Sequence, residues 1–94
     1  MTNQTTEISF TVNPDAVPSL HDGGLVILHG GRLFSSNETG ARIWRGVEQR
    51  LPLETIATEI SSAYRIARTT ARDHTLRFLT ALEQQALISI EVVS

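Results

Sequence analysis

The chain has 94 residues, a net charge of -2 and no cysteine, with 40% hydrophobic and 19% charged residues. This length predicts a single domain over residues 1–94 with one modest core, and the composition excludes a disordered chain. The missing cysteines exclude a disulfide framework, a thiolate metal site and a cysteine nucleophile, and favour a reducing cytoplasm. All eight cationic residues are Arg, but a negative net charge gives no general drive toward nucleic acid.

The start of the chain and its apolar segments bear on localisation. Residues Met1 to Thr6 are polar and lack the basic start and apolar run of a signal peptide. No apolar stretch approaches the roughly 20 residues that cross a bilayer as a helix. We therefore expect a cytoplasmic protein that neither spans nor binds a membrane.

The first third of the chain carries the patterns of β-strands. Apolar and polar residues alternate over 7–12, which predicts a half-buried strand. A second strand is expected over 17–21, and Pro18 places it at a sheet edge. The apolar run 25–28 lies between two glycine pairs and predicts a buried central strand, followed by a hairpin turn into Arg32–Ser36 near the other edge. The final segment, 88–93, alternates again and is a candidate partner for the first strand.

The middle of the chain changes to helical periodicity. Asn37 is a good N-cap for a helix over about 38–50, and Pro52 suits the first position of a second helix over about 52–64. A third helix is expected over about 68–85, with Ala67 as a weak cap. These elements predict an α+β, winged-helix-like domain: a three-stranded antiparallel N-terminal sheet, with 88–93 as an optional fourth strand, packed on three helices.

One segment carries a family resemblance. Residues 33–44 read LFSSNETGARIW, which resembles the start of the first helix in the PqqD family. The similarity extends to Leu53–Ala57, Tyr64 and the Phe78–Leu82 segment, so that a PqqD-like core covers about 17–88. Departures from the family pattern occur at Ser36, Leu51, Ala67, His74 and Ala86. The resemblance implies a non-catalytic RiPP recognition element: a peptide chaperone without cofactor that binds the leader segment of a ribosomally made precursor peptide.

The resemblance places the leader peptide on the strand Arg32–Ser36, by strand addition. Strand addition requires an open sheet edge and a neighbouring wall with pockets. For that wall we take a mixed basic and apolar line on the third helix, whose first turn carries cations that a helix dipole disfavours. The predicted peptide-binding residues are Arg32, Leu33, Phe34, Ser35, Arg68, Arg72, Thr75, Leu76 and Leu79. A solvated basic face and ordinary core packing are the alternatives for the helix residues.

Several partners and functions are open at this stage. The resemblance implies a modifying enzyme or leader protease as partner: a lasso-peptide protease, a radical SAM enzyme or a cyclodehydratase. A winged-helix DNA-binding regulator is the alternative function, with contacts from Arg65, Arg68, Arg72 and Arg77. An oligomerisation module that pairs through its strand edges is a third reading, and a homodimer is also open. No metal site is expected, because the three histidines share no ligand spacing.

Overall fold

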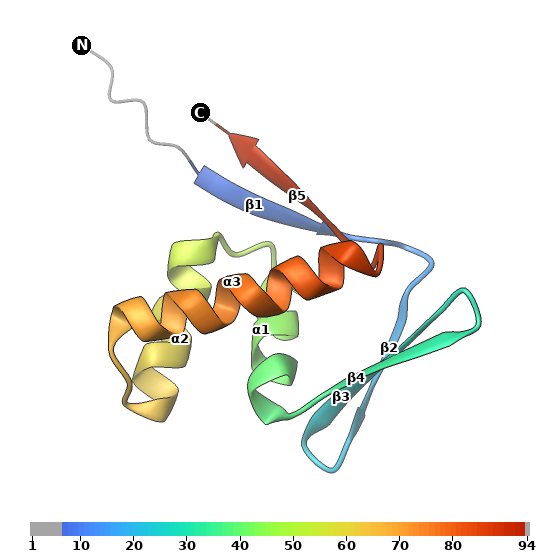
Figure 1. Cartoon of the computed structure of the whole chain (residues 1–94), viewed down its shortest axis with the longest axis horizontal. Helices are drawn as coiled ribbons and strands as arrows, with labels where there is room; N and C mark the ends of the chain where they lie inside the picture. Colours follow the sequence, from blue (N-terminus) through green and yellow to red (C-terminus); the bar gives the residue numbers. More distant parts are fainter. Residues whose placement is uncertain (1–6, 94) are drawn as a thin grey trace.

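A computed structural model describes residues 7–93 (Figure 1). The elements in chain order are β1 (Glu7–Val12), β2 (Val17–His21), β3 (Gly24–His29), β4 (Arg32–Ser36), α1 (Glu38–Glu48), α2 (Leu53–Tyr64), α3 (Arg68–Gln84) and β5 (Ile88–Val93). The predicted α+β class, with an antiparallel three-stranded sheet and three helices, is confirmed. The polar start of the chain, Met1 to Thr6, lies outside the described residues. No helix within residues 7–93 is both long and apolar enough to cross a membrane.

The three-stranded sheet has the order β2-β3-β4, so β3 is central and β2 and β4 are its two edges. Both connections are two-residue turns whose residues have positive φ, which fits type I′ hairpins: Asp22, Gly23, Gly30 and Gly31. The prediction of a fully buried central strand is wrong in one respect. Leu25 and Ile27 are buried, whereas Leu28 is 46% exposed, because the helices cover only one face of the sheet.

The two ends of the described chain form a separate two-stranded ribbon. β1 and β5 pair antiparallel, from Glu7 opposite Val93 to Val12 opposite Ile88. This pairing confirms the proposed partnership of 7–12 with 88–93, but the final segment does not join the three-stranded sheet. Asn13 fixes the junction, because its backbone N–H donates to the Leu87 carbonyl (2.9 Å) and its side-chain amide to the Ala86 carbonyl (2.8 Å).

The helices begin and end close to their predicted bounds. The Asn37 side chain accepts a hydrogen bond from the Gly40 N–H (3.1 Å), which confirms it as the N-cap of α1. Pro52 is the N-cap of α2 and not its first helical residue, so α2 starts one residue later than expected. Ala67 is the N-cap of α3 and, as predicted, makes no side-chain cap.

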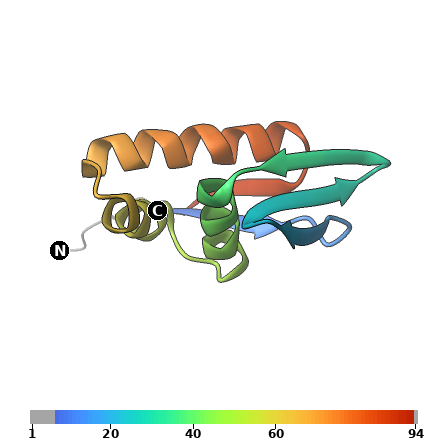
Figure 2. The same cartoon turned by 90° about the horizontal axis from the view of Figure 1, so that it is seen from below.

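The core lies between the helices and the covered face of the sheet. Its large, fully buried side chains come from every layer: Phe10, Leu25, Ile27, Ile43, Val47, Leu53, Ile56, Ile60, Leu79, Leu82 and Leu87. In Figure 2, β4 is the strand of this sheet that lies nearest to α3, close to its C-terminal end, while β2 is the strand farthest from α3. The fold therefore treats the two edges of the sheet differently.

Candidate functional site

The open edge of β4 exposes the backbone N–H and C=O groups of two residues. A type I′ turn is closed by His29 and Arg32, so the Arg32 N–H points toward β3. Because backbone direction alternates along an antiparallel strand, the N–H and C=O groups of Leu33 and Ser35 point away from β3. No strand of residues 7–93 pairs with this side of β4. Both residues are exposed, Leu33 by 71%, so the edge is accessible to an extended peptide.

An aromatic pair joins β4 to α3. The rings of Phe34 and Phe78 meet edge to face, with centroids 5.9 Å apart and an interplanar angle of 63°. Gly40 of α1 makes this packing possible, since a Cβ atom there would lie 2.7 Å from Ser36 Cβ and 2.8 Å from Phe78 Cε1. The glycine of the Asn-Glu-Thr-Gly run thus sets the distance between the end of β4 and α3.

The rotation of α3 about its axis decides which residues flank β4. Successive residues of an α-helix are rotated by about 100° around its axis. The residues of α3 that lie next to Phe78 around this axis, on the side away from the core, are therefore His74, Ala81 and Gln85. His74 is exposed, and Gln85 lines a pocket together with Phe34. We call the open edge of β4, Arg32–Ser36, together with His74, Phe78, Ala81 and Gln85, the edge site. Sequence reasoning missed these four helix residues, because periodicity does not show how a helix is turned toward a neighbouring strand.

The structure places four of the helix residues predicted for the wall away from the open edge of β4. Arg72 and Leu76 lie more than about 100° around α3 from Phe78, on the side that does not meet β4. Thr75 and Leu79 are fully buried in the core, and the Thr75 hydroxyl donates to the Ala71 carbonyl (2.7 Å). These two side chains offer no surface to a peptide in this structure, because the apolar stripe of α3 is centred on them.

The cations of the first turn of α3 also have a partner within the chain. Glu54 of α2 accepts hydrogen bonds from Arg68 Nη2 and from Arg72 Nε, each at 2.7 Å. These two hydrogen bonds hold the pKa of Glu54 below its ordinary value, and the one from Arg72 has the larger effect. Glu54 thus compensates much of the conflict between these cations and the helix dipole, so their placement no longer requires a peptide partner.

A pocket of about 270 Å³ opens at one end of the edge site. It lies between the β3–β4 turn and the C-terminal end of α3, and its lining includes His29, Arg32, Phe34 and Gln85. The His29 Nδ1 atom is buried without a hydrogen-bond partner among the described residues, while Nε2 lies 3.5 Å from the Asn13 side-chain amide. The lining combines the apolar Phe34 with the polar groups of Arg32 and Gln85, so the pocket can accept a side chain that combines an apolar body with a hydrogen-bonding end.

Other chemistries find little support in residues 7–93. No group of three or more His, Cys, Asp or Glu residues there is arranged to hold a metal ion. Two of the four arginines assigned to DNA, Arg68 and Arg72, are paired with Glu54, which gives the DNA-binding alternative no support.

Comparisons with known proteins identify the family of this chain. The model of the family "Coenzyme PQQ synthesis protein D (PqqD)" matches residues 24–88, more than half of the chain. This chain therefore belongs to the PqqD family. A search of curated proteins gave no match.

Two solved structures are similar to the whole arrangement. One is "TbiB1 in Complex with the TbiA(beta) Leader Peptide", with 29% identity, a TM-score of 0.77, and coverage of 83% of this chain and 93% of that one. The other is "Lasso peptide synthetase B1 complexed with the leader peptide", with 25% identity, a TM-score of 0.74, and coverage of 85% and 96%. Both relatives were solved with a leader peptide bound.

Proposed function

We propose that this protein is a non-catalytic adaptor that binds the leader segment of a ribosomally made precursor peptide and delivers it to a processing enzyme. The observation that carries the proposal is the open edge of β4 beside α3, in a fold shared with two proteins that were solved with leader peptides. The encounter takes place in the cytoplasm, where a ribosomally made peptide emerges. The functional unit is the PqqD-like core, about 17–88.

The peptide adds as a strand along the outward-facing groups of Leu33 and Ser35. Backbone hydrogen bonds hold the peptide without regard to its sequence, and pockets for alternate side chains provide specificity. One such pocket is the space beside His29 and Arg32. The Phe34–Phe78 pair forms the apolar part of the wall. The contribution of Arg68 and Arg72 is secondary in this proposal, because each already forms an ion pair with Glu54.

The partner that acts on the bound peptide is a modifying enzyme or a leader protease. One of the two relatives with a bound leader is a lasso peptide synthetase protein, which favours a lasso-peptide protease over a radical SAM enzyme or a cyclodehydratase. The adaptor itself supplies affinity and orientation in this arrangement. No reaction step is assigned to its own side chains.

A titration followed residue by residue tests the proposal. The ¹⁵N-labelled protein is titrated with a synthetic leader peptide from the precursor gene beside its own, and with a scrambled peptide as control. We expect the amides of Leu33 and Ser35 to shift and to gain protection from hydrogen exchange, because they enter new backbone hydrogen bonds. Absence of binding, or protection at the β2 edge in place of β4, would contradict the proposal.

A further inference from the structure

The face of the three-stranded sheet that points away from the helices carries an apolar row. In the strand register, Leu28 stands directly opposite both Val17 of β2 and Leu33 of β4. Directly opposed residues of antiparallel strands point to the same face. Leu25 and Ile27 point to the helices, so the side chains of Val17, Leu28 and Leu33 point away from the helices. Their exposed fractions are 59% for Val17, 46% for Leu28 and 71% for Leu33. We call these three residues the outer row.

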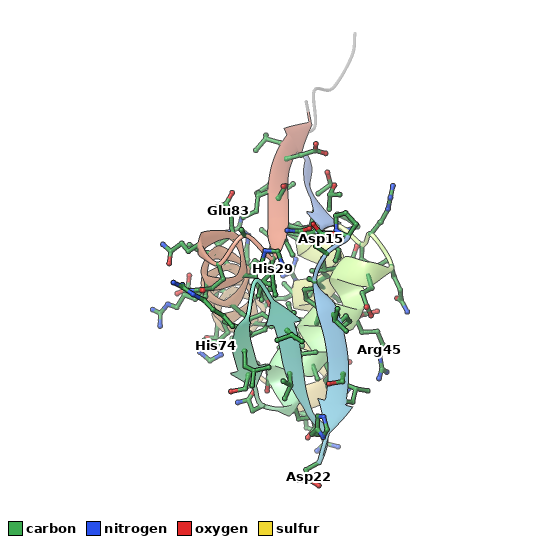
Figure 3. The ribbon with its side chains drawn as sticks, turned by 90° about the vertical axis from the view of Figure 1, so that its right-hand side faces the viewer. Asp15, Asp22, His29, Arg45, His74 and Glu83 are labelled. Carbon is green, nitrogen blue, oxygen red and sulfur yellow. The ribbon has the colours of Figure 1, made fainter. Side chains whose placement is uncertain are left out.

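The surroundings of the outer row have the character of a protein interface. The other positions on this face of the three strands are Ser19, His21, Gly24, Val26 and Ser35, and none of the residues on the face is an Asp, Glu, Lys or Arg. Interface centres are depleted of charge, while their rims are polar. Asp15 and Asp22 lie beyond the two ends of β2, and Figure 3 shows them at opposite ends of this face, with the helices behind the sheet.

The outer row is continuous with the edge that the proposed peptide uses. A peptide strand added beside β4 places the side chains opposite Leu33 and Ser35 on this same outer face. The peptide therefore extends the row Val17–Leu28–Leu33 by one strand. Three aliphatic side chains alone offer only a fraction of the roughly 800 Å² per partner that a stable interface buries, so the added strand matters for any partner that docks here.

We infer that the outer row is the docking surface for the processing enzyme, which contacts the adaptor and the bound peptide together. The inference rests on the proposed function and goes beyond it by assigning the enzyme a surface. The matching surface of the enzyme is an apolar patch with basic groups at its rim, opposite Asp15 and Asp22. Because the peptide completes the surface, the enzyme binds the loaded adaptor more tightly than the empty one.

Asp15 and Asp22 at the two ends of the face favour this occupant over two others. Arg32 lies at the same end as Asp15, but it stands opposite His29 and so points to the face that carries Leu25 and Ile27. In a second copy whose strands run along those of the first, in either direction, acidic ends meet acidic ends and repel. The same two carboxylates repel an anionic membrane surface. A basic-rimmed protein is attracted by both ends.

The test uses a variant of the outer row that lies away from the peptide edge. Leu28→Arg puts a charge at the centre of the row without changing β4. Leu20→Arg is the matched control, since Leu20 is 61% exposed in the same sheet, but its register partner is the buried Leu25, so it points to the other face. Circular dichroism and thermal melts show that each variant is folded. The probes are a synthetic leader peptide and the purified processing enzyme encoded beside the gene of this chain.

The expected results separate the two proposals. Wild type binds the enzyme several-fold more tightly when saturated with leader, and Leu28→Arg weakens enzyme binding by about tenfold or more, as for a central interface residue. Leu28→Arg leaves the Kd for the leader within about twofold, and Leu20→Arg leaves both affinities unchanged.

Three results would overturn the docking surface. One is normal enzyme binding by Leu28→Arg, and another is equal enzyme affinity with and without leader. The third is a wild-type dimer that Leu28→Arg converts to a monomer in sedimentation while enzyme binding is unchanged, because the row would then join two copies. Failure of the wild type to bind the leader at all contradicts the proposed function itself.

Discussion

The two edges of the three-stranded sheet differ in what they offer to an incoming strand. At β4 the outward-facing N–H groups belong to Leu33 and Ser35, both of which can donate. At β2, the type I′ turn closed by His21 and Gly24 fixes the backbone directions in the same way, so the backbone groups of Pro18 and Leu20 point away from β3. Pro18 has no N–H to donate. In addition, α3 flanks β4, whereas all five residues of β2 are exposed.

This difference shows how one small sheet keeps one edge open and closes the other. Proline on an edge strand is a common device against unwanted strand pairing. β2 has this device and lacks a wall, so a strand added there would find one donor fewer and few side-chain contacts. β4 has both donors and a wall that includes Phe78. The asymmetry favours strand addition at β4 over β2, as the proposed function requires.

The largest expected effect comes from Gly40→Ala, which disturbs only the β4 side. The new Cβ meets Ser36 and Phe78, so we expect a loss of about 1–3 kcal/mol in the free energy of unfolding and weaker leader binding. Gly46→Ala on the same helix is the control, because its Cβ meets only the Ile56 side chain of α2, 2.8 Å away. Denaturant titration and leader titration measure both effects. Equal loss of leader affinity in the two variants would show that Gly40 does not set the edge site.

Leu33→Pro tests the backbone donors of β4 directly. The substitution removes an outward-facing N–H and places a ring against the incoming strand, while the bonds to β3 remain. We expect the Kd for the leader to rise by about tenfold or more. Leu20→Pro removes the equivalent donor of β2 and should leave the Kd within about twofold. A similar rise in both variants would mean that the two edges do not differ in peptide binding.

Pro18→Val tests whether the proline closes the edge of β2. The variant restores a donor at an outward-facing position of an exposed strand. We expect stronger concentration-dependent self-association than in the wild type, because two such edges can pair. Sedimentation over a dilution series measures it. If the variant associates no more than the wild type at any concentration, Pro18 does not prevent strand pairing at the β2 edge.

Glu54→Gln has the smallest expected effect and tests the side of α3 away from β4. The exposed ion pairs with Arg68 and Arg72 contribute less than about 1 kcal/mol. The lowered pKa of Glu54 means that this stabilisation is present above its ordinary pKa of 4.5 and is lost as the pH falls through the lower folded value. The stability difference between wild type and variant should therefore vanish in acid, as measured by denaturant titrations across pH.

The same variant tests the original assignment of the two arginines. Glu54→Gln removes the negative charge that pairs with Arg68 and Arg72, so an acidic leader that used these two cations would bind more tightly and with a steeper salt dependence. We expect an unchanged leader Kd. A clear gain in affinity would return Arg68 and Arg72 to the peptide-binding surface.

Local patterns predicted most of the elements of this fold. Alternation identified β1 and β5, the glycine pairs placed the hairpin that ends in β4, and Asn37 fixed the start of α1. These features depend on residues close in sequence, for which dihedral preferences and capping are decisive. The candidate strand Arg32–Ser35 was found on the same basis, with the family resemblance.

The helix half of the site could not be found in this way. The sequence alone determined that α3 is amphipathic and carries cations at its start. Only the tertiary structure decided that Thr75 and Leu79 face the core, that Glu54 of α2 binds Arg68 and Arg72, and that Phe78 turns toward Phe34. The physical reason is that the period of a helix fixes which residues share a face, whereas packing against other elements fixes where each face points.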